Sequence, residues 1–144
     1  MKLARDAYAR LYGPTTGDMV RLGDTSLIAE IEHDHTHPGD ELTAGAGKIM
    51  RDGEGFCTTG TAANGALDMV IMNAIIIDAE LGIVKGDIGI RDGRIVGVGK
   101  AGNPDIMEGV TPGMTTGPNT TTVHGDNHFV TAGAIEAHAH FLSP

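Results

Sequence analysis

The clearest alternation of apolar and polar residues lies in the middle of the chain. Strand-like segments separated by turn residues occupy 67–74, 75–78, 83–84, 87–91 and 94–98. The dipeptide Asp92-Gly93 is typical of a two-residue hairpin turn, because type I′ geometry needs a positive φ at both positions. We therefore predict a sheet over 67–98 with a tight turn at this dipeptide. Its buried face is expected to carry Ile88, Ile90, Ile95 and Val98.

The first part of the chain has a different apolar spacing. Apolar residues recur at helical intervals at Leu3, Ala7, Tyr8 and Leu11. Gly13-Pro14 then interrupts the pattern. We predict a short amphipathic helix over 2–11, followed by two short strands at 20–22 and 27–31.

The end of the chain, residues 130–144, also alternates with a period of two. Apolar residues occupy one side, at Ile135, Ala137, Ala139 and Phe141, whereas the other side carries Glu136, His138 and His140. Two imidazoles at positions i and i+2 of a strand point the same way and can bind one metal ion. We therefore predict a strand that ends at Pro144 and presents His138 and His140 as metal ligands.

Other histidines compete with this pair. A second cluster contains His33, His35 and His37, but Pro38 and acidic residues flank it and no apolar face lies beneath it. We predict a solvated loop there, with adventitious binding of divalent metal at most. His124 and His128 are expected to be surface residues of a hairpin.

Residues 43–66 are rich in glycine and are predicted to form a connecting loop. The run at 45–48, Gly-Ala-Gly-Lys, superficially resembles a phosphate-binding loop, but it lacks the required spacing and the Ser or Thr after Lys. Cys57 is interpreted as an ordinary thiol rather than a nucleophile. A further long connection covers 101–128, with a predicted strand at 120–123.

Composition narrows the class of protein. The net charge is −9, and the 10 Lys and Arg residues are scattered, which argues against nucleic acid and anionic membrane as partners. With 22 Gly and 3% aromatic residues, the chain is expected to be rich in β structure with an aliphatic core. One Cys allows no internal disulfide, and neither a signal peptide nor an apolar run of about 20 residues is visible, so we expect a cytoplasmic protein.

Four further segments carry a family resemblance, at 12–18, 21–25, 88–95 and 99–106. The last of them, Gly-Lys-Ala-Gly-Asn-Pro-Asp-Ile, is highly specific. Together with the His-x-His strand, these segments resemble the N-terminal part of the urease α (catalytic) subunit, in order from about residue 2 to residue 144.

The resemblance implies a mainly β fold. Residues 1–129 are expected to form a small β-sandwich-like domain that leads into 130–144, the first strand of a metal-dependent amidohydrolase (β/α)8 barrel. Such a barrel needs roughly 200 residues or more, so it is absent from these 144 residues. In that superfamily, strands from the far C-terminus complete the small domain.

The resemblance also implies a chemistry. In ureases the matching His-x-His supplies two ligands to one ion of a dinuclear nickel centre, which hydrolyses urea to ammonia and carbamate. The bridging carbamylated Lys, two further His ligands, an Asp ligand, a general-acid His and a mobile flap occur later in the family's sequence. No catalytic residue is therefore assigned within this chain. The implied partners are urea, the β and γ subunits and nickel-loading accessory proteins, in an oligomeric enzyme.

Two departures from the family keep alternatives open. Glu136 stands where the family usually has Asp, and Ser143 where it usually has Cys. The chain is then either part of a urease catalytic subunit or an inactive split or paralogous module that serves assembly. A third reading, a hydantoinase or dihydroorotase type of amidohydrolase, is weakened by the segments at 13–15 and 103–105, which those families lack. The chain by itself is expected to be inactive.

Overall fold

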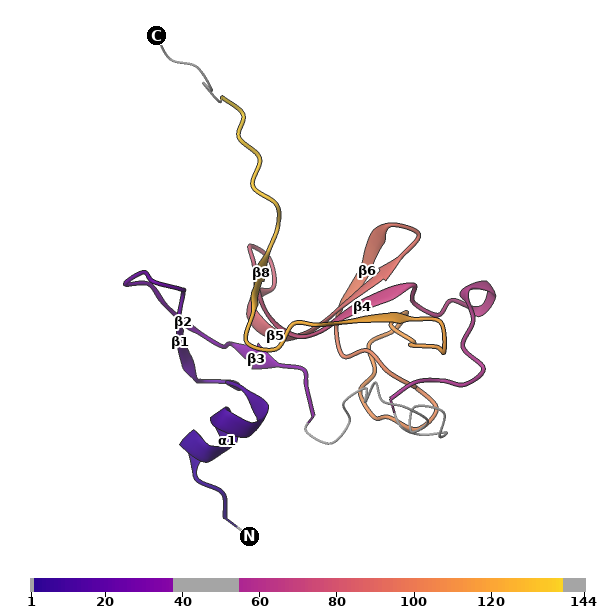
Figure 1. The fold of residues 1–144 in the computed structure, drawn as a ribbon, viewed down its shortest axis with the longest axis horizontal. Helices are drawn as coiled ribbons and strands as arrows, with labels where there is room; N and C mark the ends of the chain where they lie inside the picture. The colour runs from indigo at the N-terminus through magenta and orange to yellow at the C-terminus, as the bar shows by residue number, and fades with distance from the viewer. Residues whose placement is uncertain (1, 38–54, 139–144) are drawn as a thin grey trace.

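The structure, a computed structural model, describes residues 2–37 and 55–138. It is mainly β, as predicted (Figure 1). In chain order the elements are α1 (Arg5–Tyr12), β1 (Met19–Arg21), β2 (Ile28–Glu30), β3 (His33–Asp34), η1 (Ala62–Asn64), β4 (Met69–Asp78), β5 (Gly82–Arg91), β6 (Arg94–Gly99), β7 (Thr121–His124) and β8 (Phe129–Thr131). Within the described ranges, neither helical segment is long and apolar enough to cross a membrane.

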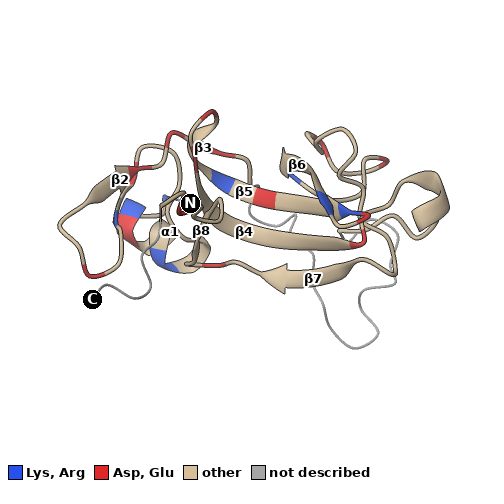
Figure 2. Ribbon diagram, turned by 90° about the horizontal axis from the view of Figure 1, so that it is seen from above, with Lys and Arg blue, Asp and Glu red and all other residues tan. Residues whose placement is uncertain are grey.

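The main sheet is built on the antiparallel pair β4 and β5. On the outer side of β5, β3 pairs in parallel and β6 pairs antiparallel. On the outer side of β4, β7 and β8 both pair in parallel and follow one another along the strand. Figure 2 shows β5, β4 and β7 side by side, with charged positions on β5. The two long strands therefore hold together segments that are far apart in the sequence.

The predicted hairpin turn at Asp92-Gly93 is confirmed. Asp92 and Gly93 have φ values of 52° and 70°, and Arg91 pairs with Arg94 across the turn. The expected burial of Ile95 is wrong, because this side chain is 67% exposed. The register of β5 and β6 shifts between residues 89 and 90, next to the turn, so simple alternation does not extend to the hairpin tip.

A bulge joins the two runs predicted at 67–74 and 75–78 into one strand, β4. Asn73 has φ +56°, and the pairing with β5 shifts between Ile71 and Ala74. An extra residue at a bulge changes which side chains share a face. Met72 consequently belongs to one core cluster, whereas Ala74 belongs to the other.

The core is aliphatic apart from one aromatic ring, and it lies on both faces of the sheet. One cluster is covered by the connections before β4 and after β6, and it contains Phe56, Leu67, Val70, Met72, Ala101 and Met114. The other contains Ala74, Ile76, Val84 and Ile88, with Ile71, Ile90, Val98 and Val130 packed against it. The four side chains packed against the second cluster are only partly buried, so this face of the sheet is incompletely covered by the described residues.

The N-terminal elements agree with the apolar spacing. Helix α1 ends at Gly13, whose φ of +80° disfavours other residues, and Pro14 follows. Strands β1 and β2 form a separate antiparallel ribbon that confirms the two predicted short strands. Arg5 of the helix contacts Asp18 at 2.9 Å, which ties α1 to the start of the ribbon.

The predicted solvated loop at the second histidine cluster is wrong for its first residues. His33 and Asp34 form β3 and pair with Val84 and Lys85 of β5. Backbone N–H groups of Glu32 and His35 donate to the Ile83 and Lys85 carbonyls at 2.8 Å, and the Asp34 carboxylate lies 3.3 Å from the Lys85 ammonium in a buried pair. A segment without apolar residues therefore becomes part of the sheet.

Candidate functional site

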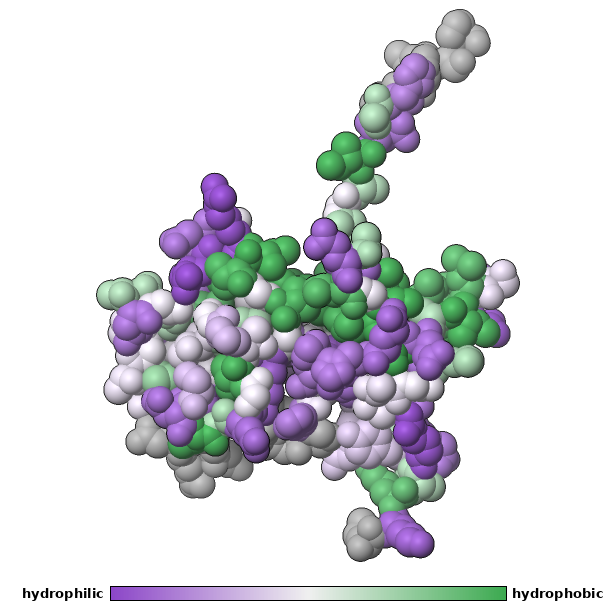
Figure 3. All heavy atoms as spheres, turned by 180° about the vertical axis from the view of Figure 1, so that it is seen from behind, coloured by the Kyte–Doolittle hydropathy of each residue, from purple (hydrophilic) through white to green (hydrophobic). Residues whose placement is uncertain are grey.

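The chain leaves the sheet before it reaches the predicted metal ligands. β8 pairs with β4 from Phe129 to Thr131, but residues 132–136 have no regular secondary structure and 137–138 form a bend. Residues 132–138 are thus not paired as a strand in this chain, and their expected role as the first strand of a barrel stays a prediction. Figures 1 and 3 show this tail extending away from the body of the domain. Ile135 is 93% exposed, and a strand conformation needs the backbone partners of a neighbouring strand.

His138 lies on this tail and is exposed. Its backbone N–H donates to Oε1 of Glu136 at 2.7 Å, so the glutamate carboxylate holds the backbone just before the first predicted ligand. His140 and Ser143 lie outside the described residues. The joint binding of a metal by His138 and His140 stays a prediction.

The histidines near β7 are surface residues, as expected. His124 is exposed and its Nδ1 lies 3.6 Å from Oδ2 of Asp126, whereas Nδ1 of His128 lies 2.7 Å from the Asp126 carbonyl oxygen. The expected hairpin is wrong, because β7 and β8 both pair with β4 and not with each other. In the part of the chain that the structure describes, no group of three or more His, Cys, Asp or Glu residues is arranged to hold a metal ion.

The second histidine cluster is more ordered than its sequence indicates. The rings of His33 and His35 meet edge to face, with centroids 4.3 Å apart and planes at 77°. His35 is half-buried, and this burial lowers its pKa below the ordinary value, with a further contribution from His33. His37 is exposed and lies at the rim of a pocket.

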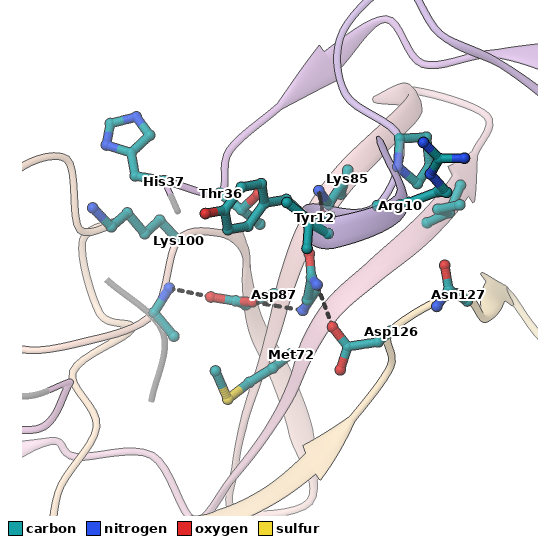
Figure 4. Close-up of a pocket in the computed structure, with 16 residues that line it drawn as sticks. Arg10, Tyr12, Thr36, His37, Met72, Lys85, Asp87, Lys100, Asp126 and Asn127 are labelled. Carbon is teal, nitrogen blue, oxygen red and sulfur yellow. Dashed lines mark hydrogen bonds between the residues drawn. The ribbon is translucent and has the colours of Figure 1, made fainter. Parts of the chain in front are cut away.

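That pocket was not predicted. It has a volume of about 350 Å³ and lies between the end of α1, strands β4 and β5, and residues 126–127 (Figure 4). Lys85 and Asp87 of β5 line it together with Lys100. Lys85 also donates from Nζ to the Tyr12 carbonyl at 2.8 Å, which anchors the end of the helix over the sheet.

The buried carboxylate of Asp87 connects three segments. One oxygen accepts from the Asn73 backbone N–H at 2.9 Å, and the other accepts from the Ala101 N–H at 2.8 Å. Burial raises the pKa of Asp87, while these two hydrogen bonds and the charge of Lys100 oppose the increase. Asn73 donates from Nδ2 to Asp126. Since both Asp87 carboxylate oxygens accept hydrogen bonds from backbone N–H groups, we assign this residue a structural role.

A single acidic residue inside an apolar strand was the sequence signal for this arrangement. Asp87 precedes the run Ile-Gly-Ile in β5, where a charge is costly unless it is paired. The bulge at Asn73 supplies one of the two donors, and that bulge has no clear local signature. The sequence analysis therefore did not predict the two hydrogen bonds that Asp87 accepts from the Asn73 and Ala101 backbones.

Of the two other candidate chemistries, only the one at Cys57 falls within the described residues. Cys57 is buried, and its Sγ lies 3.2 Å from Oγ1 of Thr59 and 3.9 Å from Oδ2 of Asp105. A buried Sγ beside a hydroxyl and a carboxylate agrees with an ordinary thiol. The run at 45–48 lies outside the described residues.

Comparison with known proteins gives a consistent family. The family model described as "Urease alpha-subunit, N-terminal domain" matches residues 1–123. The urease subunit alpha of Natronomonas pharaonis is 56% identical over 142 residues, and that of Haloquadratum walsbyi is 55% identical over 142 residues. The urease subunit alpha of Laribacter hongkongensis is 53% identical over 142 residues.

These alignments cover 99% of this chain but 25% of each of the three relatives. The chain therefore spans about a quarter of their length. The match includes the segments on which the resemblance rests, and it does not favour a hydantoinase or dihydroorotase type of protein. On this similarity, the chain belongs to the urease α-subunit family and corresponds to its N-terminal portion.

Proposed function

We propose that this chain is the N-terminal part of a nickel-dependent urease catalytic subunit, which hydrolyses urea to ammonia and carbamate when the barrel is present. The observation that carries the proposal is the similarity to urease α subunits over 99% of the chain. The function belongs to the whole subunit, of which the chain supplies the β domain and the entry to the barrel.

The donor chemistry of the tail fits nickel. Neutral imidazole is a suitable ligand for Ni²⁺, and His138 with His140 would hold one ion of the pair. Bound nickel would polarise the urea carbonyl and lower the pKa of a bound water. His138 is exposed, so its side chain could reach a nickel ion that is also bound by the remaining ligands, which the family carries later in its sequence.

The chain's own contribution is to anchor and orient the tail that carries the ligands. The pairing of β8 with Ile75–Ile77 of β4 fixes where the tail leaves the sheet. The hydrogen bond from His138 N–H to the Glu136 carboxylate restrains the backbone at the first ligand. Glu136 is thus a positioning residue for the first ligand.

A chimeric subunit tests the proposal. This chain would be joined to the remaining three quarters of the Laribacter hongkongensis urease subunit alpha and produced with the other subunits and accessory proteins of that system, nickel and bicarbonate. We expect release of ammonia from urea, loss of this activity in His138→Ala, and retention in the matched surface variant His124→Ala. Full activity in His138→Ala would contradict the proposed ligand, and an inactive, correctly assembled chimera would favour the assembly-module alternative.

A further inference from the structure

The backbone that carries His33 and His35 is fixed on both sides. Glu32 donates its N–H to the Ile83 carbonyl at 2.8 Å, and His35 donates its N–H to the Lys85 carbonyl at 2.8 Å. The two histidines therefore flank one residue of an ordered strand at the margin of the sheet. Their separation does not depend on the tail or on a barrel.

The residue between them faces the other way. Asp34 is held by its buried pair with Lys85, and its backbone N–H donates to Oγ1 of Thr16 at 3.0 Å. Because successive side chains of a strand point to opposite faces, the two imidazoles lie on the same face, away from this pair. Their ring contact confirms that they are neighbours.

The spacing of the two rings matches a chelate. A late first-row metal ion lies about 2 Å from a ring nitrogen and thus roughly 3.2 Å from the ring centre. When the nitrogen–metal–nitrogen angle is 90°, the centres of the two rings are therefore about 4.5 Å apart. A tetrahedral angle would place the centres about 5.2 Å apart. The observed centroid distance is 4.3 Å. His33 is exposed, and its ring can turn about χ2 to direct a nitrogen to the same ion as His35.

We propose that His33 and His35 form a bidentate site for a divalent late first-row metal ion, with Ni²⁺ and Cu²⁺ preferred over Zn²⁺. The preference follows from the ring spacing, because 4.3 Å is nearer to the separation of about 4.5 Å for a 90° ligand angle than to the roughly 5.2 Å for a tetrahedral one, and 90° suits square-planar and octahedral coordination. Water completes the coordination. The net charge of −9, with Glu30 and Glu32 in the same segment, attracts cations to this edge.

The room for the ring of His35 comes from a glycine on the neighbouring strand. A Cβ at Gly86 would lie 3.3 Å from Cδ2 of His35, tighter than an ordinary contact. Among the residues that the structure describes, neither imidazole takes part in a side-chain hydrogen bond, and the ring of His33 is exposed. With two protein ligands, the site is expected to be weaker than a four-ligand structural site and to exchange its metal.

The test uses the 144-residue chain with the tail pair removed, as His138→Ala/His140→Ala. Calorimetric titration with Ni²⁺, Cu²⁺ and Zn²⁺ at neutral pH should show one Ni²⁺ or Cu²⁺ per chain. His33→Ala and His35→Ala should each weaken this binding by about tenfold or more, because the second ligand then no longer acts at high effective concentration. His124→Ala is the control and should bind as the background chain does. Circular dichroism verifies that each variant keeps its β structure.

The electron paramagnetic resonance spectrum of bound Cu²⁺ gives an independent readout. Nitrogen couplings from two imidazoles are expected, reduced to one in either single variant. Absence of binding in the background chain, or equal affinity in the His33→Ala/His35→Ala variant, would overturn the site and leave the ring contact as simple packing. Tighter binding of Zn²⁺ than of Ni²⁺ would overturn the metal preference.

Discussion

The ammonium of Lys85 lies 3.3 Å from the carboxylate of Asp34, and both side chains are almost completely buried. This ion pair joins a two-residue strand to the centre of the sheet. The same ammonium donates to the Tyr12 carbonyl, so one cation connects α1, β3 and β5. The pair therefore determines how the N-terminal segment packs on the domain.

Removal of this cation should be costly. In Lys85→Met, the Asp34 carboxylate would remain buried without its counter-charge, and we expect the free energy of unfolding to fall by about 3–5 kcal/mol. Guanidinium unfolding followed by circular dichroism measures the loss. Arg10→Met is the matched control, because Arg10 forms an exposed pair with Asp6 and its loss should cost less than about 0.5 kcal/mol. Equal effects of the two substitutions would argue against the structural role of Lys85.

The hairpin turn offers a comparison that isolates backbone conformation. A Cβ at Gly93 or Gly133 would meet no atom within 4 Å, but Gly93 has φ +70° whereas Gly133 does not have a positive φ. We expect Gly93→Ala to lower the free energy of unfolding by about 1 kcal/mol. Gly133→Ala should leave it unchanged or slightly increased. Equal stability of Gly93→Ala and Gly133→Ala would contradict the positive φ at Gly93.

The pH dependence of stability should reveal the buried carboxylate. Burial raises the pKa of Asp87 above its ordinary value of 3.8, so the folded state binds this proton more tightly than the unfolded chain. The contribution of Asp87 is therefore greatest below pH 3.8 and is lost as the pH rises through the folded pKa. Asp87→Asn also loses one hydrogen-bond acceptor, a cost of about 1–3 kcal/mol. The stability difference between the parent chain and the variant should shrink as the pH rises.

Asp78 provides a control of opposite sign. Backbone hydrogen bonds from Leu81 and Glu80 lower its pKa below 3.8, so its contribution is present above that pH and is lost as the pH falls through the folded pKa. The difference between the parent chain and Asp78→Asn should grow as the pH rises. Unfolding curves at a series of pH values measure both trends. The same trend for both variants would contradict the assignment for Asp87.

The predictability of these features depends on how local they are. The turn at Asp92-Gly93 could be predicted because two adjacent residues define its geometry. β3 could not, because His33 and Asp34 have no apolar pattern and join the sheet through Lys85, 51 residues away from Asp34. The tail shows the converse case. Its alternation favours a strand, but no described residue pairs with it after Thr131.

The chain alone should not hydrolyse urea. A two-metal hydrolytic site needs enough ligands to hold two ions about 3.5–4 Å apart and an open position for substrate. This chain offers the tail pair and, separately, the proposed pair at His33 and His35, which lies on an edge of the sheet. Purified chain should release no more ammonia than nickel in buffer. Activity above that blank that is lost in His138→Ala would show that the chain is sufficient.

The most direct test of the central claim is the nickel content of the chimeric subunit after assembly and desalting. The parent chimera should retain two ions per subunit, as a dinuclear site requires. His138→Ala/His140→Ala should lose this tightly held nickel and the urease activity. His33→Ala/His35→Ala should keep both the nickel and the activity, because the proposed site at His33 and His35 loses its metal during desalting. Retention of two ions after loss of the tail pair, with nickel lost from the His33→Ala/His35→Ala variant instead, would contradict the assignment of His138 and His140.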